Sequence, residues 1–194
     1  MKIICIGDSL TYGYRVNNEN RWTYLCQHHY GGINFINKGK LGDTTAGMIY
    51  RFHEDVILER PGTTIIMGGT NDFLMNSSLE NVIDNIATMA KDGKQSNINI
   101  VLGIQPPVIP SLAETLWASQ VNYEKINNKI KLYREWALNF SKETCISYID
   151  FYKKISQELN NIDVKKLYID GIHLTSEGHK LMAETALDTL DILS

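Results

Sequence analysis

The sequence predicts an α/β protein built on a five-stranded parallel sheet with helices on both faces. Short runs rich in isoleucine and valine alternate along the chain with segments of helical periodicity. Most of these runs are continuously apolar, as strands buried on both faces are. The 194 residues, 43% of them hydrophobic and 21% charged, suit one domain with a substantial core. We therefore expect a single domain over residues 1–194.

Five apolar runs are the expected strands. In chain order they are Lys2–Ile6, Ile33–Ile36, Thr63–Met67, Ile98–Gly103 and Ile146–Asp150.

Five helical segments lie between or after these runs. They are expected around Trp22–His29, from near Thr44, from Ser77, across Tyr123–Phe140, and from about Ser176. Ser77 and Glu80 have the spacing of a capping box, and Ser119 is the expected N-cap of the fourth helix. The segment Ile104–Trp117 has no periodicity and contains Pro106, Pro107 and Pro110, so a stiff loop is predicted there.

The composition excludes several classes of protein. A net charge of −3 without a basic stripe argues against nucleic acid as a partner. No apolar stretch approaches the roughly 20 residues of a membrane span, and the first residues do not resemble a secretory signal.

The cysteines and histidines predict no metal site. The three cysteines are scattered, with no Cys-x-x-Cys pair, and Cys5 and Cys145 fall in apolar runs where burial is expected. The histidines His28, His29, His53 and His179 lack metal-ligand spacing and are expected to be structural or exposed. We expect a cytoplasmic protein without a cofactor.

Polar and glycine residues follow the predicted strands. They are Gly7-Asp8-Ser9, Gly42-Asp43-Thr44 and Asn71-Asp72, with Asp170-x-x-His173 just before the last helix. The carboxyl ends of parallel strands meet at one edge of a sheet, where open α/β sheets bind ligands. Each piece alone is ordinary turn or cap chemistry. Their joint occurrence at one edge predicts a site.

These residues fit acyl transfer. A serine hydroxyl such as that of Ser9 needs a base, His173 can supply it, and Asp170 can orient that histidine from the same loop. The backbone N–H of Ser9, the N–H of Gly42 and the side-chain amide of Asn71 are candidate donors to an oxyanion.

The sequence closely resembles the GDSL/SGNH hydrolase family. The resemblance rests on Gly7-Asp8-Ser9-Leu10, Gly42, Gly69-x-Asn71-Asp72 and Asp170-x-x-His173, which appear in the family's order across most of the chain. It implies a flavodoxin-like three-layer α/β/α sandwich and metal-free hydrolysis of esters or thioesters. It also implies that Ser9 is the nucleophile, His173 the base, Asp170 its orienter, and Ser9, Gly42 and Asn71 the oxyanion donors.

Four residues near these motifs are candidate substrate contacts. They are Asp8, Tyr12, Pro106 and Pro107, and the whole Ile104–Trp117 segment is expected to flank the acyl or leaving-group pocket. Each has a plainer alternative: Asp8 and Asp72 brace turns, while Tyr12, Tyr14 and Trp22 pack or face solvent as readily as they line a pocket.

The substrate class stays open at this stage. Small-molecule, lipid and carbohydrate esters all fit, including acetyl and short acyl esters, lysophospholipids and thioesters. An acyltransferase with the same three residues is one alternative. A flavin- or nucleotide-binding module that holds phosphate at Ser9, Thr11 and Gly13 is another, although it gives Asp170 and His173 no purpose. The oligomeric state cannot be read from the sequence.

Overall fold

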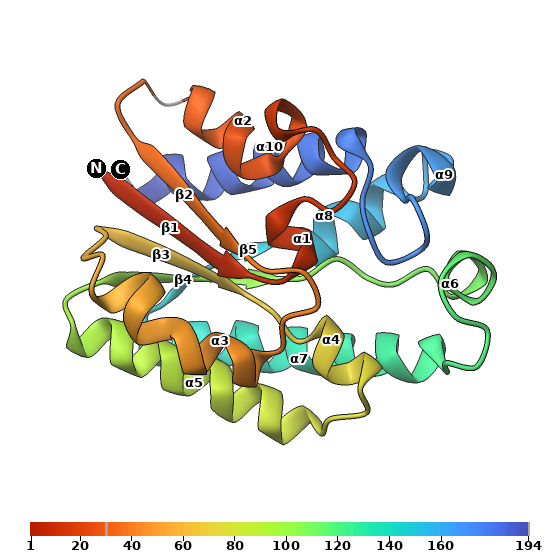
Figure 1. The fold of residues 1–194 in the computed structure, drawn as a ribbon, viewed down its shortest axis with the longest axis horizontal. Coiled ribbons are helices and arrows are strands. Elements are labelled where there is room, and N and C mark those ends of the chain that lie inside the picture. Colours follow the sequence, from red (N-terminus) through yellow and green to blue (C-terminus); the bar gives the residue numbers. More distant parts are fainter. Residues whose placement is uncertain (30, 194) are drawn as a thin grey trace.

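The computed structural model describes residues 1–29 and 31–193, which surround a five-stranded sheet (Figure 1). The strand order is β2-β1-β3-β4-β5 and every neighbouring pair is parallel. The strands are β1 (Lys2–Gly7), β2 (Asn34–Gly39), β3 (Thr63–Met67), β4 (Asn99–Ile104) and β5 (Ser147–Asp150). The predicted parallel sheet is confirmed. The largest difference is at β2, which continues to Gly39 instead of ending at Ile36.

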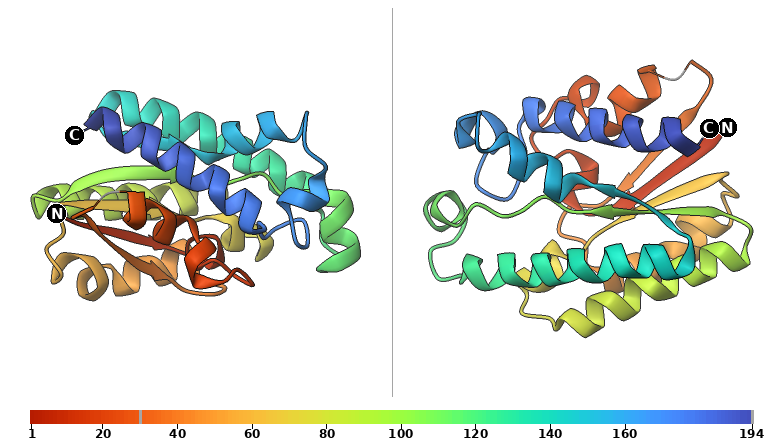
Figure 2. Two further views of the ribbon diagram at one scale, coloured as in Figure 1. Left: turned by 90° about the horizontal axis from the view of Figure 1, so that it is seen from above. Right: turned by 180° about the vertical axis from the view of Figure 1, so that it is seen from behind.

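Long helices cover both faces of the sheet. One layer holds α3 (Thr45–Phe52), α5 (Leu79–Gln95) and α7 (Tyr123–Thr144), and the other holds α2 (Trp22–His29), α8 (Phe151–Glu158) and α10 (Ser176–Leu193) (Figures 1 and 2). The result is a three-layer α/β/α arrangement.

Four short helices follow strands or precede the last loop. They are α1 (Ser9–Tyr12), α4 (Thr70–Leu74), α6 (Pro110–Leu116) and α9 (Val164–Leu167), and all lie toward the carboxyl edge of the sheet (Figure 1).

The core has two halves because alternate side chains of each strand point to opposite faces. In β1, Ile4 and Ile6 pack with α3, α5 and α7, whereas Ile3 and Cys5 pack with α2, α8 and α10. The central strand β3 is buried along its whole length, which explains why it reads as a continuous apolar run.

Two predicted N-caps are wrong. The helix expected from Ser77 has Ser78 as its N-cap, and the Ser78 side chain accepts a hydrogen bond from the N–H of Asn81. The long helix is capped by Asn122, which accepts from the N–H of Lys125, and not by Ser119. Neighbouring polar residues compete for such positions, and local sequence does not decide between them.

Helices α4, α6, α8 and α9 lie where none was predicted. The Ile104–Trp117 segment contains α6, which has Pro110 in its first turn, where the missing N–H costs no hydrogen bond. Helix α8 follows β5 directly, and Asp150 caps it by accepting from the N–H of Lys153. No turn residue separates the strand from this helix.

The cysteines differ in burial. Cys5 and Cys26 are buried, but Cys145 is exposed, contrary to the prediction. Cys145 ends α7 in a left-handed conformation, with φ of 54°, and therefore lies before β5 and not within it. Burial raises the pKa of Cys26 to about 12 and that of Cys5 well above its ordinary value.

Within the described residues, none of the helices combines the length and the apolar character that crossing a membrane requires.

Candidate active site

Ser9 is the first residue of α1 and follows the carboxyl end of β1. Asp8 is the N-cap, and its carboxylate accepts a hydrogen bond from the N–H of Leu10 at 2.8 Å. The Ser9 N–H lies in the first turn, where backbone donors lack helical partners and the dipole favours negative charge. The strand, cap and short helix together present the Ser9 hydroxyl at the sheet edge.

Asp170 and His173 lie in the loop between α9 and α10. Asp170 Oδ1 accepts from the N–H groups of Ile172 and His173, at 3.0 and 2.8 Å, so the loop folds around its carboxylate. Asp170 Oδ2 lies 2.8 Å from His173 Nδ1. Burial raises the pKa of Asp170, but the hydrogen bonds to His173 and Ile172 outweigh it and hold that pKa below its usual value.

The structure brings Ser9 and His173 together across almost the whole chain. Ser9 Oγ lies 3.0 Å from His173 Nε2. Because Asp170 is ionised at neutral pH, the proton of a neutral His173 ring belongs on Nδ1, facing the carboxylate. Nε2 is then free to accept the hydroxyl proton of Ser9. This geometry can activate a serine for attack on a carbonyl carbon.

Gly42 and Asn71 lie on the neighbouring strand exits. Gly42 has a φ of +71°, and a Cβ added there would meet no atom within 4 Å, so space is open above its backbone. Asn71 lies in the first turn of α4, and its Nδ2 donates to the carbonyl of Asp43 at 2.9 Å. An amide has a second N–H, which remains for another acceptor.

Asp72 braces the same region, as expected from the sequence. Its two carboxylate oxygens accept from the N–H and the hydroxyl of Thr45, at 2.9 and 2.7 Å. These bonds tie the start of α3 to α4.

Asp8 is buried and directly precedes Ser9. Burial raises its pKa to about 7, against the opposing effects of the Leu10 N–H and the His173 ring, and the nearby carboxylates of Asp72 and Asp43 raise it further. Its position as a helix cap agrees with the bracing role that the sequence also allowed.

Two aromatic rings flank His173. The Tyr14 ring centroid lies 4.5 Å from the imidazole centroid, and that of Trp117 lies 5.0 Å away. Trp117 was not singled out by sequence reasoning, although it ends the segment expected to flank the pocket. Nothing in the sequence indicates that Trp117, at the end of α6, contacts His173, which follows α9.

Tyr12 and Trp22 have other neighbours. Tyr12 is partly exposed and its ring lies 4.5 Å from the Arg21 guanidinium. Trp22 is fully buried and packs against Phe151, so it belongs to the core.

Pro106 and Pro107 are buried, and the Pro107 carbonyl accepts from the Tyr168 hydroxyl at 2.6 Å. Two residues farther on, the N–H of Ile109 donates to the carbonyl of Gly171 at 2.7 Å. The proline segment therefore packs against the loop that carries Asp170 and His173.

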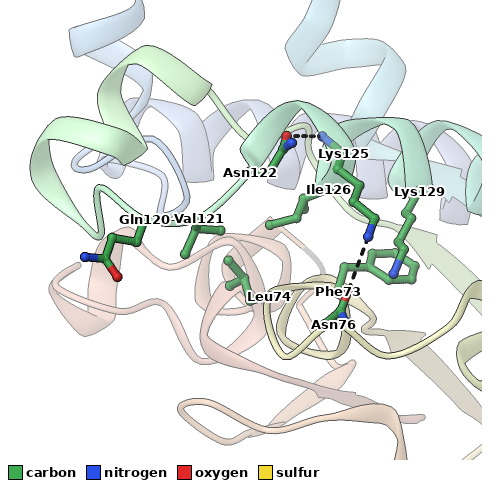
Figure 3. A pocket seen from close by; sticks show the side chains of 9 residues that line it. All are labelled: Phe73, Leu74, Asn76, Gln120, Val121, Asn122, Lys125, Ile126 and Lys129. Carbon is green, nitrogen blue, oxygen red and sulfur yellow. Dashed lines mark hydrogen bonds between the residues drawn. The ribbon is translucent and has the colours of Figure 1, made fainter.

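A cavity of about 240 Å³ lies between α4 and the start of α7 (Figure 3). Phe73, Leu74 and Ile126 give it an apolar lining, and Lys125 and Lys129 add two ammonium groups. It begins two residues after Asn71, on the same short helix.

The histidine His179 is structural. Its Nδ1 accepts from the N–H of Trp22 at 3.3 Å, which joins α10 to α2. Burial, and then the charges of Arg21 and His173, lower its pKa to about 4, so the ring is neutral at pH 7. Across the described part of the chain, no three or more His, Cys, Asp or Glu side chains are grouped so that they could hold a metal ion.

Comparison with known proteins places the chain in a family of lipases and acylhydrolases. The model of the GDSL-like lipase/acylhydrolase family matches residues 5–181. The chain is 24% identical to the acetylxylan esterase of Geobacillus stearothermophilus, over 96% of this chain and 92% of that protein. It is 29% identical to the arylesterase of Vibrio mimicus, over 52% of each chain, so it spans about half the length of that relative.

Solved structures show the same fold. A G-D-S-L family protein from Desulfitobacterium hafniense has a TM-score of 0.81 and 29% identity, covering 97% of this chain and 98% of that one. A member of the same family from Veillonella parvula has a TM-score of 0.83 and 23% identity, covering 98% of both. The acetylxylan esterase has been solved as catalytic mutants with alanine in place of a serine, a histidine or an aspartate. The histidine mutant has a TM-score of 0.79 at 22% identity, over 97% of this chain and 93% of that one.

Proposed function

The chain belongs to the GDSL-like lipase/acylhydrolase family, and we propose that it hydrolyses carboxylic esters through an acyl-enzyme intermediate on Ser9. One observation carries the proposal. The Ser9 hydroxyl lies 3.0 Å from a histidine whose other ring nitrogen lies 2.8 Å from a buried, ionised carboxylate. The relative solved as catalytic mutants at a serine, a histidine and an aspartate supports the same three roles here.

In the first half-reaction, Ser9 Oγ attacks the ester carbonyl carbon while His173 Nε2 takes the hydroxyl proton. Asp170 holds the ring and stabilises the imidazolium. The tetrahedral intermediate collapses, the bond to the alcohol oxygen breaks, and His173 returns the proton to the leaving alcohol. An acyl group remains on Ser9.

In the second half-reaction, water replaces the alcohol. His173 Nε2 takes a proton from water as the water oxygen attacks the acyl carbon. Collapse breaks the bond to Ser9 Oγ, which regains a proton from His173, and the free acid leaves.

The oxyanion of both intermediates needs hydrogen-bond donors. We assign this role to the N–H of Ser9, the N–H of Gly42 and the second side-chain N–H of Asn71. Each donor is worth roughly 3–4 kcal/mol in the transition state. The open space above Gly42 supports its assignment.

Covalent labelling tests the nucleophile. A fluorophosphonate should add one mass increment to the native protein and none to Ser9→Ala, with ester hydrolysis lost in the same variant. Equal labelling of both proteins would remove Ser9 from the role.

For the substrate we propose acetyl or other short acyl esters. The Tyr14 and Trp117 rings beside His173 leave the site bounded by aromatic surfaces, and the acetylxylan esterase gives a carbohydrate ester as one candidate. A panel of acyl esters of increasing chain length, with acetylated sugars, lysophospholipids and thioesters, tests this. A rate that rises with chain length would contradict it.

Transfer to an alcohol or sugar uses the same residues. Product ratios measured with and without a hydroxyl acceptor separate acyl transfer from hydrolysis. Family membership decides against the flavin- or nucleotide-binding module.

We also propose a cytoplasmic location. All three cysteines are free, as is usual in a reducing compartment. Cell fractionation of the native host tests it, and recovery outside the cytoplasm would contradict it.

A further inference from the structure

Arg51 of α3 is a buried cation with four hydrogen-bond partners near the site. Its Nε donates to Asp43 Oδ2 at 2.8 Å, and its Nη2 donates to the carbonyl of Gly7 at 3.0 Å. Its Nη1 donates to the carbonyl of Lys38 at 2.8 Å and to Asp55 Oδ2 at 2.7 Å. One guanidinium thus contacts the ends of β1 and β2, the loop before α3, and the π-helical segment His53–Ile57.

Asp43 links Arg51 to two of the proposed oxyanion donors. It follows Gly42 in the chain, so holding the Asp43 side chain limits the movement of the Gly42 backbone. Its carbonyl accepts from Asn71 Nδ2 at 2.9 Å, which leaves the second N–H of that amide with a fixed direction. The Asp43 carboxylate also accepts from the N–H of Thr44 at 3.1 Å, just before α3.

The Gly7 carbonyl links Arg51 to the third donor. It accepts from Arg51 Nη2 and also from the N–H of Lys40, each at 3.0 Å. Gly7 ends β1 and is followed by Asp8 and Ser9. The three donors are far apart in sequence, yet the segment of each has a bond to Arg51 or to Asp43.

Packing in the core does not hold the Gly42 loop. Residues 40–42 are exposed, and Gly42 has the left-handed φ noted above. A buried ion pair by itself adds little net stability compared with packed apolar side chains. A planar guanidinium, in contrast, fixes several acceptors in one geometry.

We propose that Arg51 is a positioning residue for the oxyanion hole. Through Asp43 and the Gly7 and Lys38 carbonyls it holds the three donors in the arrangement that the tetrahedral intermediate requires. Preorganised donors are the source of oxyanion stabilisation, so loosening them costs turnover and not substrate binding. This inference rests on the proposed function.

The first test compares two identical substitutions, Arg51→Lys and Arg134→Lys. Arg134 is the matched control because its Nε and Nη2 bond the Asp150 carboxylate at 3.0 and 2.8 Å on β5, separated from β1 by β3 and β4. For Arg51→Lys we expect kcat to fall roughly 10- to 100-fold, the effect of a small misplacement of catalytic groups, with KM within about threefold. Arg134→Lys should keep kcat within about twofold, because its partner Asp150 lies on β5, two strands away from β1, and is not bonded to any proposed oxyanion donor.

The second test uses a small alkylboronic acid, which forms a tetrahedral adduct on a nucleophilic serine. Its inhibition constant should rise in Arg51→Lys by about the factor by which kcat falls. Thermal unfolding and circular dichroism of both variants separate this from loss of fold. If Arg51→Lys does not fold, Asp43→Ala removes the carboxylate that links Arg51 to the loop while Arg51 keeps its bond to Asp55. We then expect the same lower kcat and weaker boronate inhibition, with KM within about threefold.

Two results would overturn the proposal. One is an equal kcat for the Arg51 and Arg134 variants. The other is a lower kcat in the Arg51 variant with no change in the inhibition constant of the boronic acid. Failure of the proposed function itself looks different, because the unsubstituted protein would then hydrolyse no ester and bind no boronate.

Discussion

At the scale of single residues, Asp8 caps helix α1, but its burial disfavours the ionised form of its carboxyl group. Its carboxylate accepts the Leu10 N–H, yet its pKa is raised to about 7 from an ordinary value of 3.8. The folded state therefore keeps a proton that the unfolded chain has already lost. Stability from this group is present below pH 4 and is lost as the pH rises toward and through 7.

Replacing Asp8→Asn should raise stability above pH 7. The Asn oxygen still accepts the Leu10 N–H, and the gain at pH 8 is about 1.4 kcal/mol for each pKa unit by which the aspartate is raised. Urea unfolding at pH 5 and pH 8 measures it. If Asp8 had its ordinary pKa, the free energy of unfolding would depend on pH in the same way in the native protein and the variant.

Asn71→Ala should lower kcat roughly 10²- to 10³-fold, as removal of one oxyanion donor does. The fold should persist, because Asn71 loses only one bond, to the Asp43 carbonyl. Steady-state kinetics beside Asn128→Ala, an exposed asparagine of α7, checks this. Full activity in Asn71→Ala would take Asn71 out of the oxyanion hole.

The residues of the proposed site could be picked out from the sequence because each stands in a short motif. Ser9, Gly42, Asn71, Asp170 and His173 each follow a strand or precede a helix with a recognisable neighbour pattern. Arg51 and Trp117 do not. Arg51 bonds Gly7 across 44 positions in the chain, and such pairings arise only when the sheet forms.

At the scale of elements, the loop of Asp170 and His173 depends on α6. Gly171 has a φ of +87°, and a Cβ there would lie 2.5 Å from the N of Ala113 and 2.7 Å from the carbonyl of Ile109. Only glycine allows the loop to approach the start of α6 this closely. The position of His173 relative to Ser9 therefore depends on a backbone contact with a helix about 60 residues earlier.

Gly171→Ala should separate α6 from the loop and reduce both stability and kcat. Gly32→Ala is the matched control, since Gly32 also has a positive φ, of +121°, but no atom lies within 4 Å of its added Cβ. The control should lose about 1–3 kcal/mol to backbone strain alone and keep its kcat. Equal kcat values in the two variants would show that the α6 contact does not position His173.

Elements with a strong period were predictable, and their ends were not. The runs that became β1, β3 and β4 are buried on both faces, and α2 and α10 begin where expected. The caps shifted to Ser78 and Asn122 because adjacent polar residues cap equally well by sequence. Helix α8 was missed because it follows β5 without a turn.

At the scale of the whole molecule, alternation of strands and helices was enough to predict a parallel sheet covered on both faces. It was not enough to give the order β2-β1-β3-β4-β5. That order brings β1 and β3 together at the centre, so Ser9 and Asn71 leave the sheet from neighbouring strands. Ser9 meets His173 because the final loop returns to the same edge.

The three cysteines should become accessible to a thiol reagent in a fixed order as the fold opens. Cys145 lies just before the amino end of β5, whereas Ser9 lies at the carboxyl edge of the sheet. Cys26 lies on α2 and packs against α10, with its Sγ 3.8 Å from the Ala183 carbonyl. Cys5 lies within β1, next to the central strand. In a thiol-exchange reagent we expect Cys145 to react first, Cys26 when α10 lifts, and Cys5 only on global unfolding.

Mass spectrometry of time points counts the modified thiols, and Cys145→Ser should lack the first phase alone. Simultaneous reaction of all three would contradict the order. If this order of reaction holds, the native thiols report local and global unfolding separately, without an engineered cysteine. A probe attached to Cys145 would then leave the proposed ester site unmodified.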